Sequence, residues 1–261
     1  MLAMAALAAG CLNVRTENPS FDATVAEARE ALEAMENDPV TLDRPVVVLS
    51  GIFDPGLMAR SLARRLEAAV GDDRVIHVAF PGAWSFDACR KRAIEAVDEA
   101  FPNDDPEWTT EVDVVGVSMG GIVARYAATA LETDDWEPQA RRLRIARLFT
   151  LGSPHQGASM AALPTPDPRA RAMRAESEFM KRLDEAAEDE AYTLYPYVRL
   201  SDRMVGAHNA APPGETPIWV PNRPLRPAHL TVAADPRIVA DIARRLRGEE
   251  PLAAEPREPL P

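Results

Sequence analysis

The sequence predicts an α/β protein in which helices cover both faces of a central, mostly parallel β-sheet. Two observations predict this fold class. Short apolar runs, typical of buried strands, alternate along the chain with longer segments whose apolar residues recur at helical spacing. The chain has 261 residues, of which 46% are hydrophobic, so it can bury one sizeable core. Strands that alternate with helices indicate a parallel sheet, because each crossover returns the chain through a helix.

The predicted strands are short apolar runs, and the predicted helices carry an apolar stripe. The run PVVVLS over Pro45–Ser50 is unbroken, which fits a strand buried on both faces. Ser20 is the predicted cap of the first helix. Further strands are expected over Arg74–Phe80, from Val112 to Gly116, and over Ile145–Leu151, Tyr195–Leu200 and Ile218–Val220, and further helices over Leu57–Val70, Phe86–Phe101 and Pro236–Arg247.

The two ends of the chain are expected to lie outside the main domain. Residues 1–11 are apolar and end in Ala-Ala-Gly-Cys, which resembles a bacterial lipoprotein signal with Cys11 as the lipidated residue. Residues 12–44 are a predicted tether and helix, residues 45–247 the main domain, and residues 248–261 a Pro- and Glu-rich tail predicted to be disordered. A lipidated Cys11 would anchor the protein to a membrane of the cell envelope. The alternative is a frayed apolar N-terminus in a cytoplasmic protein.

Charge and residue usage exclude several classes of partner. The chain carries 41 Asp and Glu against 29 Lys and Arg, a formal net charge of -12, so nucleic acid is not an expected partner. Its 4 His and 2 Cys lack the spacing of metal ligands, and no phosphate-cradling loop is present, so no metal or other cofactor is expected. Cys89 lies on the apolar face of a predicted helix and is expected to be an inert core thiol.

The most informative motif is Gly116-Val117-Ser118-Met119-Gly120, between a predicted strand and a predicted helix. It has the G-x-S-x-G pattern of a nucleophile elbow, a tight turn with a serine at its apex. The turn has no room for bulk two residues before or after the serine, which explains Gly116 and Gly120. A strained backbone and a helix N-terminus behind it would expose the hydroxyl and favour negative charge. The motif predicts Ser118 as a nucleophile, and the alternative is an ordinary glycine-rich turn.

A serine nucleophile needs a base to remove its proton. His229 stands directly before the last predicted helix, where a catalytic base is expected, and it is the predicted base. His208 is the alternative. His77 lies inside a predicted strand, and His155 precedes every suitable acid in the chain, so both are expected to be structural.

The base needs an acid that orients it. Asp202 follows the carboxyl end of the predicted strand Tyr195–Leu200, where open α/β sheets carry their ligands, and it is the predicted acid. The alternative role for Asp202 is ordinary loop capping. Asp235 competes less well as the acid, because its position before Pro236 fits the N-cap of the last helix.

Acyl transfer also needs N–H donors for the oxyanion that forms on the acyl group. One expected donor is the backbone N–H of Met119, the residue after the nucleophile. The second is the N–H of Ile52, in the loop after the first strand of the main domain, where Gly51 lets the backbone turn sharply. The alternative is an ordinary strand-to-helix loop.

Five stretches together resemble the α/β-hydrolases of the lipase and esterase group. They are VVVLSGIFD (46–54), VDVVGVSMGGIVARY (112–126), LFTLGSPHQG (148–157), RLSDRMVG (199–206) and AHLTVAADPRIVADI (228–242). The resemblance implies the α/β-hydrolase fold over residues 45–247, with Ser118, Asp202 and His229 as a catalytic triad and Ile52 and Met119 as the oxyanion donors. The chain departs from the family at Ser50, where a histidine usually precedes the glycine, but that histidine is not the base.

Residues 158–192 form a predicted insertion that bears on the substrate. Its apolar residues are expected either to line an acyl pocket or lid, or to dock the insertion on the core: Met160, Leu163, Met173, Phe179, Met180 and Leu183. The stretch from Met173 to Leu183 resembles the lid-side helix of the same family. An apolar lid would favour medium or long acyl chains.

The expected function is hydrolysis of carboxylic esters, of lipid or other apolar acyl substrates, through an acyl-enzyme on Ser118. One alternative is an acyltransferase or thioesterase that uses the same triad. Another is a non-catalytic lipoprotein with a vestigial site. The expected partners are a small-molecule ester or lipid and, through Cys11, a membrane, and the sequence does not indicate an oligomeric state.

Overall fold

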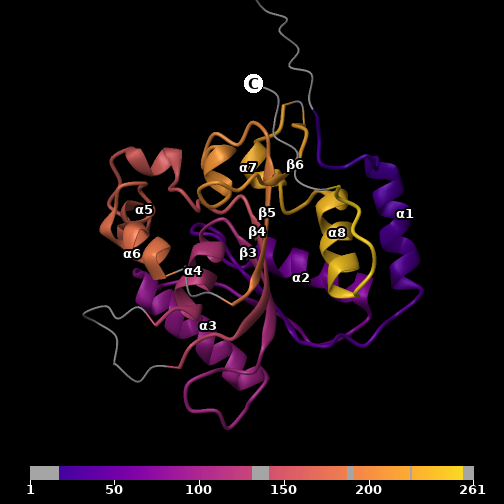
Figure 1. Ribbon diagram of the computed structural model, residues 1–261, viewed down its shortest axis with the longest axis horizontal. Coiled ribbons are helices and arrows are strands. Elements are labelled where there is room, and N and C mark those ends of the chain that lie inside the picture. Colours follow the sequence, from indigo (N-terminus) through magenta and orange to yellow (C-terminus); the bar gives the residue numbers. More distant parts are fainter. Residues whose placement is uncertain (1–17, 131–140, 187–190, 224, 255–261) are drawn as a thin grey trace, which may run out of the picture.

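The structure is a computed structural model that describes residues 18–130, 141–186, 191–223 and 225–254. Its centre is a six-stranded sheet with parallel neighbours throughout and the strand order β2-β1-β3-β4-β5-β6. The strands are β1 (Val46–Leu49), β2 (Val75–Val78), β3 (Val112–Val117), β4 (Ile145–Leu151), β5 (Thr193–Arg199) and β6 (Ile218–Val220). The predicted fold class, a parallel sheet between helical layers, is confirmed (Figure 1).

Helices cover both faces of this sheet (Figure 1). On one face lie α1 (Val25–Glu36), α2 (Leu57–Val70) and α8 (Pro236–Leu246), and on the other lie α3 (Phe86–Ala100) and α4 (Met119–Ala128). Side chains of β1 alternate between the two cores: Val46 and Val48 pack with α1, α2 and α8, whereas Val47 and Leu49 pack with α3 and α4. An unbroken apolar run is therefore what a central strand needs.

Short helices occupy the connections at the carboxyl ends of the strands. They are η1 (Ser159–Ala162), α5 (Pro168–Ala172) and α6 (Glu178–Ala186) after β4, η3 (His208–Ala210) after β5, and α7 (Ala228–Thr231) after β6. Helix α6 packs on the α3 and α4 side of the sheet, where the Phe179 ring stacks on the Phe86 ring with centroids 4.3 Å apart.

The prediction that Ser20 caps the first helix is wrong. The helix begins later, with Thr24 as its N-cap, because Thr24 and Glu27 form a capping box. Ser20 is instead fully buried against β6: its hydroxyl accepts from the N–H of Trp219 at 3.0 Å, and its own N–H donates to the Trp219 carbonyl at 3.1 Å. The segment before the helix is thus part of the folded body.

The prediction of a disordered tail from Gly248 is wrong for residues 248–254. The N–H of Ala253 donates to the buried Asp241 carboxylate at 2.8 Å, and the N–H of Ala254 donates to the carbonyl of Ser20 at 2.8 Å. Composition predicts disorder here, but a buried carboxylate on α8 needs donors, and the segment supplies one. Residues 255–261 lie outside the described residues.

The N-terminal segment, residues 1–17, also lies outside the residues that the structure describes. Lipidation at Cys11 and a location in the cell envelope therefore stay predictions. Within the described ranges, no helix has both the length and the apolar character needed to cross a bilayer.

Candidate active site

Ser118 lies at the apex of a tight turn between β3 and α4. Its backbone has φ 53° and ψ -121°, in the region that strains a residue with a side chain. A Cβ on Gly116 would lie 2.5 Å from the Cα of Gly121, and a Cβ on Gly120 would lie 2.4 Å from the carbonyl oxygen of Leu49. Close backbone contacts thus explain the glycines of the motif. Gly121, which the sequence pattern did not single out, has a different reason, because a Cβ there would lie 2.3 Å from the side-chain Oγ of Ser153.

His229, in α7, joins Ser118 to Asp202. Its Nε2 lies 2.9 Å from Oγ of Ser118, and its Nδ1 lies 2.7 Å from Oδ2 of Asp202. The other carboxylate oxygen, Oδ1, accepts from the N–H groups of Met204 and Val205 at 2.9 and 3.0 Å. An ionised carboxylate only accepts, so this geometry suits an imidazole tautomer with its proton on Nδ1 and the lone pair of Nε2 toward the hydroxyl. The structure thus brings the three predicted residues together.

Among the described residues, His229 is the histidine that bonds to the Ser118 hydroxyl, whereas the alternative base His208 lies in η3 after β5. His155 is fully buried, with its Nε2 2.9 Å from Oγ1 of Thr150 in β4. Burial holds the pKa of His155 well below its ordinary value, so the ring is neutral. His77 lies within β2, as expected.

The loop after β1 lies directly against Ser118. A Cβ on Gly51 would lie 3.3 Å from Cβ of Ser118 and 3.9 Å from its Oγ. Ile52 follows in this loop, and Met119 is the first residue of α4, whose first N–H groups have no partner within the helix. The carboxylate of Asp54, which the sequence did not single out, accepts from three N–H groups of the following turn at 2.9 to 3.1 Å and fixes the loop. The role of Ile52 and Met119 as oxyanion donors stays a prediction.

Ser50 occupies the position that is usually a histidine in the family which the sequence resembles. Its side chain is fully buried, and no group among the described residues hydrogen-bonds to its hydroxyl. Its N–H donates to the carbonyl of Val78 at 3.0 Å, and its own carbonyl oxygen would lie 2.9 Å from a Cβ on Gly120. Ser50 therefore holds the start of the loop between β2 and the elbow.

Gly152, directly after β4, packs behind the pair formed by Asp202 and His229. A Cβ there would lie 3.2 Å from Oδ2 of Asp202 and 3.2 Å from Nδ1 of His229, the two atoms that bond to each other. The residue also has a φ of 61°, which favours glycine. The sequence shows only a glycine after a strand, so this contact could not be read from it.

We expect Gly152→Ala to lower kcat/KM for the esters expected as substrates by about 10- to 100-fold, because a methyl group would displace two atoms whose placement within about 0.5 Å matters. Gly214→Ala is the matched control: Gly214 has a φ of 83°, and a Cβ on it would meet nothing within 4 Å. Steady-state kinetics and thermal unfolding of both variants separate backbone strain from displacement of the pair. If Gly152→Ala and Gly214→Ala had equal kcat/KM, the expected displacement of Asp202 and His229 would be contradicted.

The insertion after β4 mainly docks onto the core. Of its six predicted apolar residues, three are buried (Met173, Met180 and Leu183), Phe179 is partly buried, and two are exposed (Met160 and Leu163). Docking therefore accounts for the first four, and only Met160 and Leu163, 48% and 59% exposed, are free to meet a substrate. A role of the insertion as a lid stays a prediction.

Large apolar side chains are exposed at one edge of the sheet in the described part of the chain. They are Phe53, Leu57, Trp84, Met160, Leu163, Leu225 and Leu230, which we call the apolar rim. Each follows the carboxyl end of β1, β2, β4 or β6. In a parallel sheet these ends meet at one edge, and Ser118, at the end of β3, lies at the same edge. The apolar rim therefore lies at the same edge of the sheet as the candidate site.

We also searched the described residues for a second candidate site, in cavities, in groups of metal-ligating side chains and at cysteines. A cavity of about 1090 Å³ lies where β4 begins, lined by residues such as Trp108, Thr129 and Tyr192, and it contains neither Ser118 nor His229. In the ranges that the structure describes, no three His, Cys, Asp or Glu side chains are grouped to hold a metal ion. Cys89 is fully buried, and burial raises the pKa of its thiol to about 11, which fits an inert core thiol.

Comparisons with known proteins concern both sequence and structure. Residues 89–164, less than a third of the 261-residue chain, match the family described as a PGAP1-like alpha/beta domain, and this stretch includes Ser118. No curated protein matches the chain in sequence. In structure, the chain is similar to the lipase BlEst2 from Bacillus licheniformis in its mature form, with 16% identity, coverage of 82% of this chain and 94% of that one, and a TM-score of 0.50. It is also similar to Est1E from Butyrivibrio proteoclasticus, with 11% identity, coverage of 80% and 90%, and a TM-score of 0.52.

Proposed function

Because the chain has the α/β-hydrolase fold, we propose that it is a serine hydrolase that cleaves carboxylic esters through an acyl-enzyme on Ser118. The observation that carries the proposal is the position of His229, 2.9 Å from Oγ of Ser118 and 2.7 Å from Oδ2 of Asp202. A serine hydroxyl is a weak nucleophile alone, and a base held by a carboxylate is what activates it.

In the acylation step, Oγ of Ser118 forms a bond to the acyl carbon while its proton passes to Nε2 of His229. The carboxylate of Asp202 stabilises the imidazolium that results, and it holds the ring in place through Nδ1. When the tetrahedral intermediate collapses, the bond from the acyl carbon to the alcohol oxygen breaks, and Nε2 gives its proton to that oxygen. Water then attacks the acyl-enzyme by the same route, which releases the acid and restores Ser118.

Negative charge develops on the carbonyl oxygen of the substrate in both steps. The N–H groups of Ile52 and Met119 are the proposed donors to this oxygen, because both belong to backbone that adjoins Ser118. The N-terminus of α4 adds a favourable field at the same point. Fixed donors of this kind cost no reorganisation when the reaction occurs.

The apolar rim supports lipid or other apolar acyl groups as the substrate class. Phe53 is the neighbour of Ile52 and is 77% exposed, and Leu230 is the neighbour of His229 and is 53% exposed. Exposed apolar side chains grouped around a site mark a surface that binds apolar ligands. Lipidation at Cys11, if present, would keep the enzyme beside such substrates.

A series of p-nitrophenyl esters of rising acyl chain length, assayed beside the matching acyl-CoA thioesters, tests this function. We expect kcat/KM to rise at least about tenfold from acetate to octanoate, because each fully buried CH₂ contributes about 0.8 kcal/mol. A preference for the thioesters would identify a thioesterase instead. No turnover of any ester would contradict the proposal.

The exposed pair Met160 and Leu163 gives a sharper test of the substrate class. We expect the double variant Met160→Ser, Leu163→Ser to lower kcat/KM for octanoate by about fivefold or more, since it removes apolar contact area. Acetate is the matched control substrate, because its acyl group carries a single methyl for apolar contact, and its kcat/KM should stay unchanged. An equal loss with both esters would show damage to the site rather than to acyl binding.

A further inference from the structure

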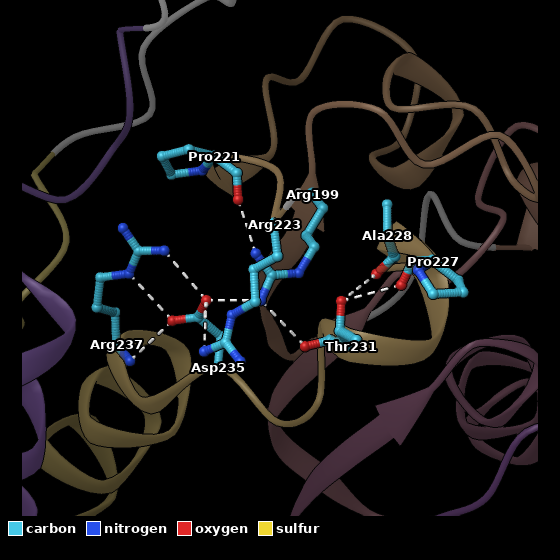
Figure 2. A network of polar contacts seen from close by, with 8 residues as sticks. All are labelled: Arg199, Pro221, Arg223, Pro227, Ala228, Thr231, Asp235 and Arg237. Carbon is cyan, nitrogen blue, oxygen red and sulfur yellow. Dashed lines mark hydrogen bonds and ion pairs between the residues drawn. The ribbon is translucent and has the colours of Figure 1, made fainter. Parts of the chain in front are cut away.

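Arg199, the last residue of β5, has a fully buried guanidinium that connects three elements (Figure 2). Its Nη1 donates to the carbonyl of Pro221 at 2.7 Å, and its Nη2 donates to the carbonyl of Thr231 at 3.1 Å and to Oδ2 of Asp235 at 2.7 Å. A buried charge without acceptors is costly, so a guanidinium in this position retains them. The three bonds therefore fix the end of β6, the end of α7 and the start of α8 relative to β5.

Helix α7 depends on such an anchor because it is only one turn long, and a single turn is not stable alone. Thr231, its last residue, closes the turn through its Oγ1, which donates to the carbonyls of Pro227 at 3.0 Å and Ala228 at 3.2 Å (Figure 2). The bond from Arg199 holds this closed turn by its last carbonyl, two residues after His229.

The backbone of Arg199 bonds to Asp202, the partner of His229. The N–H of Asp202 donates to the carbonyl of Arg199 at 3.0 Å. Arg199 thus holds Asp202 through its carbonyl and the helix of His229 through its guanidinium. The 2.7 Å bond between Nδ1 of His229 and Oδ2 of Asp202 spans the two segments that this one residue connects.

Asp235, the N-cap of α8, completes the network in Figure 2. Arg237 binds the same carboxylate, with Nε 3.0 Å from Oδ1 and Nη2 3.1 Å from Oδ2, and Arg223 lies 4.0 Å away. Burial acts to raise the pKa of Asp235, but the hydrogen bond and charge of Arg237 and the charge of Arg199 keep it below its ordinary value. Among the described residues, the side chain of Arg237 bonds to Asp235 and to neither α7 nor β5, which makes it a matched control for Arg199.

We propose that Arg199 is a positioning residue for the site, which sets the distance between α7 and the loop after β5 and so keeps His229 bonded to Asp202. This inference rests on the proposed function of Ser118, His229 and Asp202. Without the guanidinium, α7 is no longer held to β5 by its last carbonyl. His229 then spends time away from Asp202 with its ring misaligned toward Ser118, although the residues that react are unchanged.

The test combines NMR of the histidine rings with kinetics, on the full chain and its Arg199→Met, Arg199→Lys and Arg237→Met variants. The chain has only 4 histidines, and a His229→Gln variant identifies the signal of His229. In Arg199→Met we expect the Nδ1 proton of His229 to exchange with water at least about tenfold faster and kcat for a short ester to fall about 100-fold, with KM within about twofold. Arg199→Lys should recover part of both, because an ammonium can reach fewer of the acceptors.

Arg237→Met removes a comparable contact with Asp235 and should leave the His229 signal and kcat as in the wild type. Unchanged exchange and kcat in Arg199→Met, or equal changes in Arg237→Met, would overturn the inference. If Arg199→Met does not fold, Arg199→Lys carries the same comparison. Faster exchange at His229 in Arg199→Met would support the positioning role even if the wild type hydrolysed no ester, a result that would contradict the proposed function alone.

Discussion

Replacing Ser118 with alanine is expected to lower kcat for p-nitrophenyl ester hydrolysis by about 10⁵-fold or more, with the fold unchanged. The hydroxyl is the atom that forms the acyl-enzyme, so the variant leaves only whatever rate water achieves in the oxyanion site. The loss should appear in kcat, since alanine removes no part of the surface that binds the acyl chain.

Ser61→Ala is the matched control for this variant, because Ser61 is an exposed serine within α2. Its kcat should equal that of the wild type, and circular dichroism should show the same helix content in all three proteins. Activity of Ser118→Ala within about tenfold of the wild type would assign the hydrolysis to another residue.

Replacing Asp202 with asparagine is expected to lower kcat by about 10⁴-fold, because the substitution reverses the proton positions on His229. The amide oxygen can still accept from Met204 and Val205, which bond to Oδ1 of Asp202, so the loop keeps its shape. The amide NH₂ then faces Nδ1 and forces that nitrogen to accept. The ring proton moves to Nε2, which can no longer take a proton from Ser118.

Asp73→Asn serves as the control, since Asp73 is an exposed aspartate before β2, at the other edge of the sheet. Steady-state kinetics on the same ester compare the two variants. A loss of less than about tenfold in Asp202→Asn, equal to that in Asp73→Asn, would mean that Asp202 does not orient the base.

Much of the fold could be predicted because a parallel sheet leaves a local signal. The bounds of α2 and β4 agree with the sequence, since apolar periodicity and a following glycine or turn are properties of a short window. Two predictions were wrong, the helix cap at Ser20 and the disordered tail over residues 248–254, because the bonding partners are not adjacent in the sequence. Ser20 bonds to Trp219, and Ala253 bonds to Asp241, and neither pairing is visible from the residues beside them.

The candidate site could likewise be predicted from the sequence only in part. Ser118, Asp202 and His229 stand at strand or helix ends, and their order along the chain is itself a signal, so the sequence could place them together. Gly152 and Arg199 could not be found in this way. Their effect depends on contacts across neighbouring strands and with α7, which only the folded chain shows.

Labelling of the purified protein with a fluorophosphonate probe, with mass spectrometry of its peptides, shows whether Ser118 is an activated nucleophile. Such probes react with a serine only when a base activates it. We expect a single adduct on Ser118, no adduct in Ser118→Ala, and labelling at least about 100-fold slower in His229→Ala than in the wild type. An unlabelled wild type, or a label that persists in Ser118→Ala, would contradict the claim that Ser118 is an activated nucleophile.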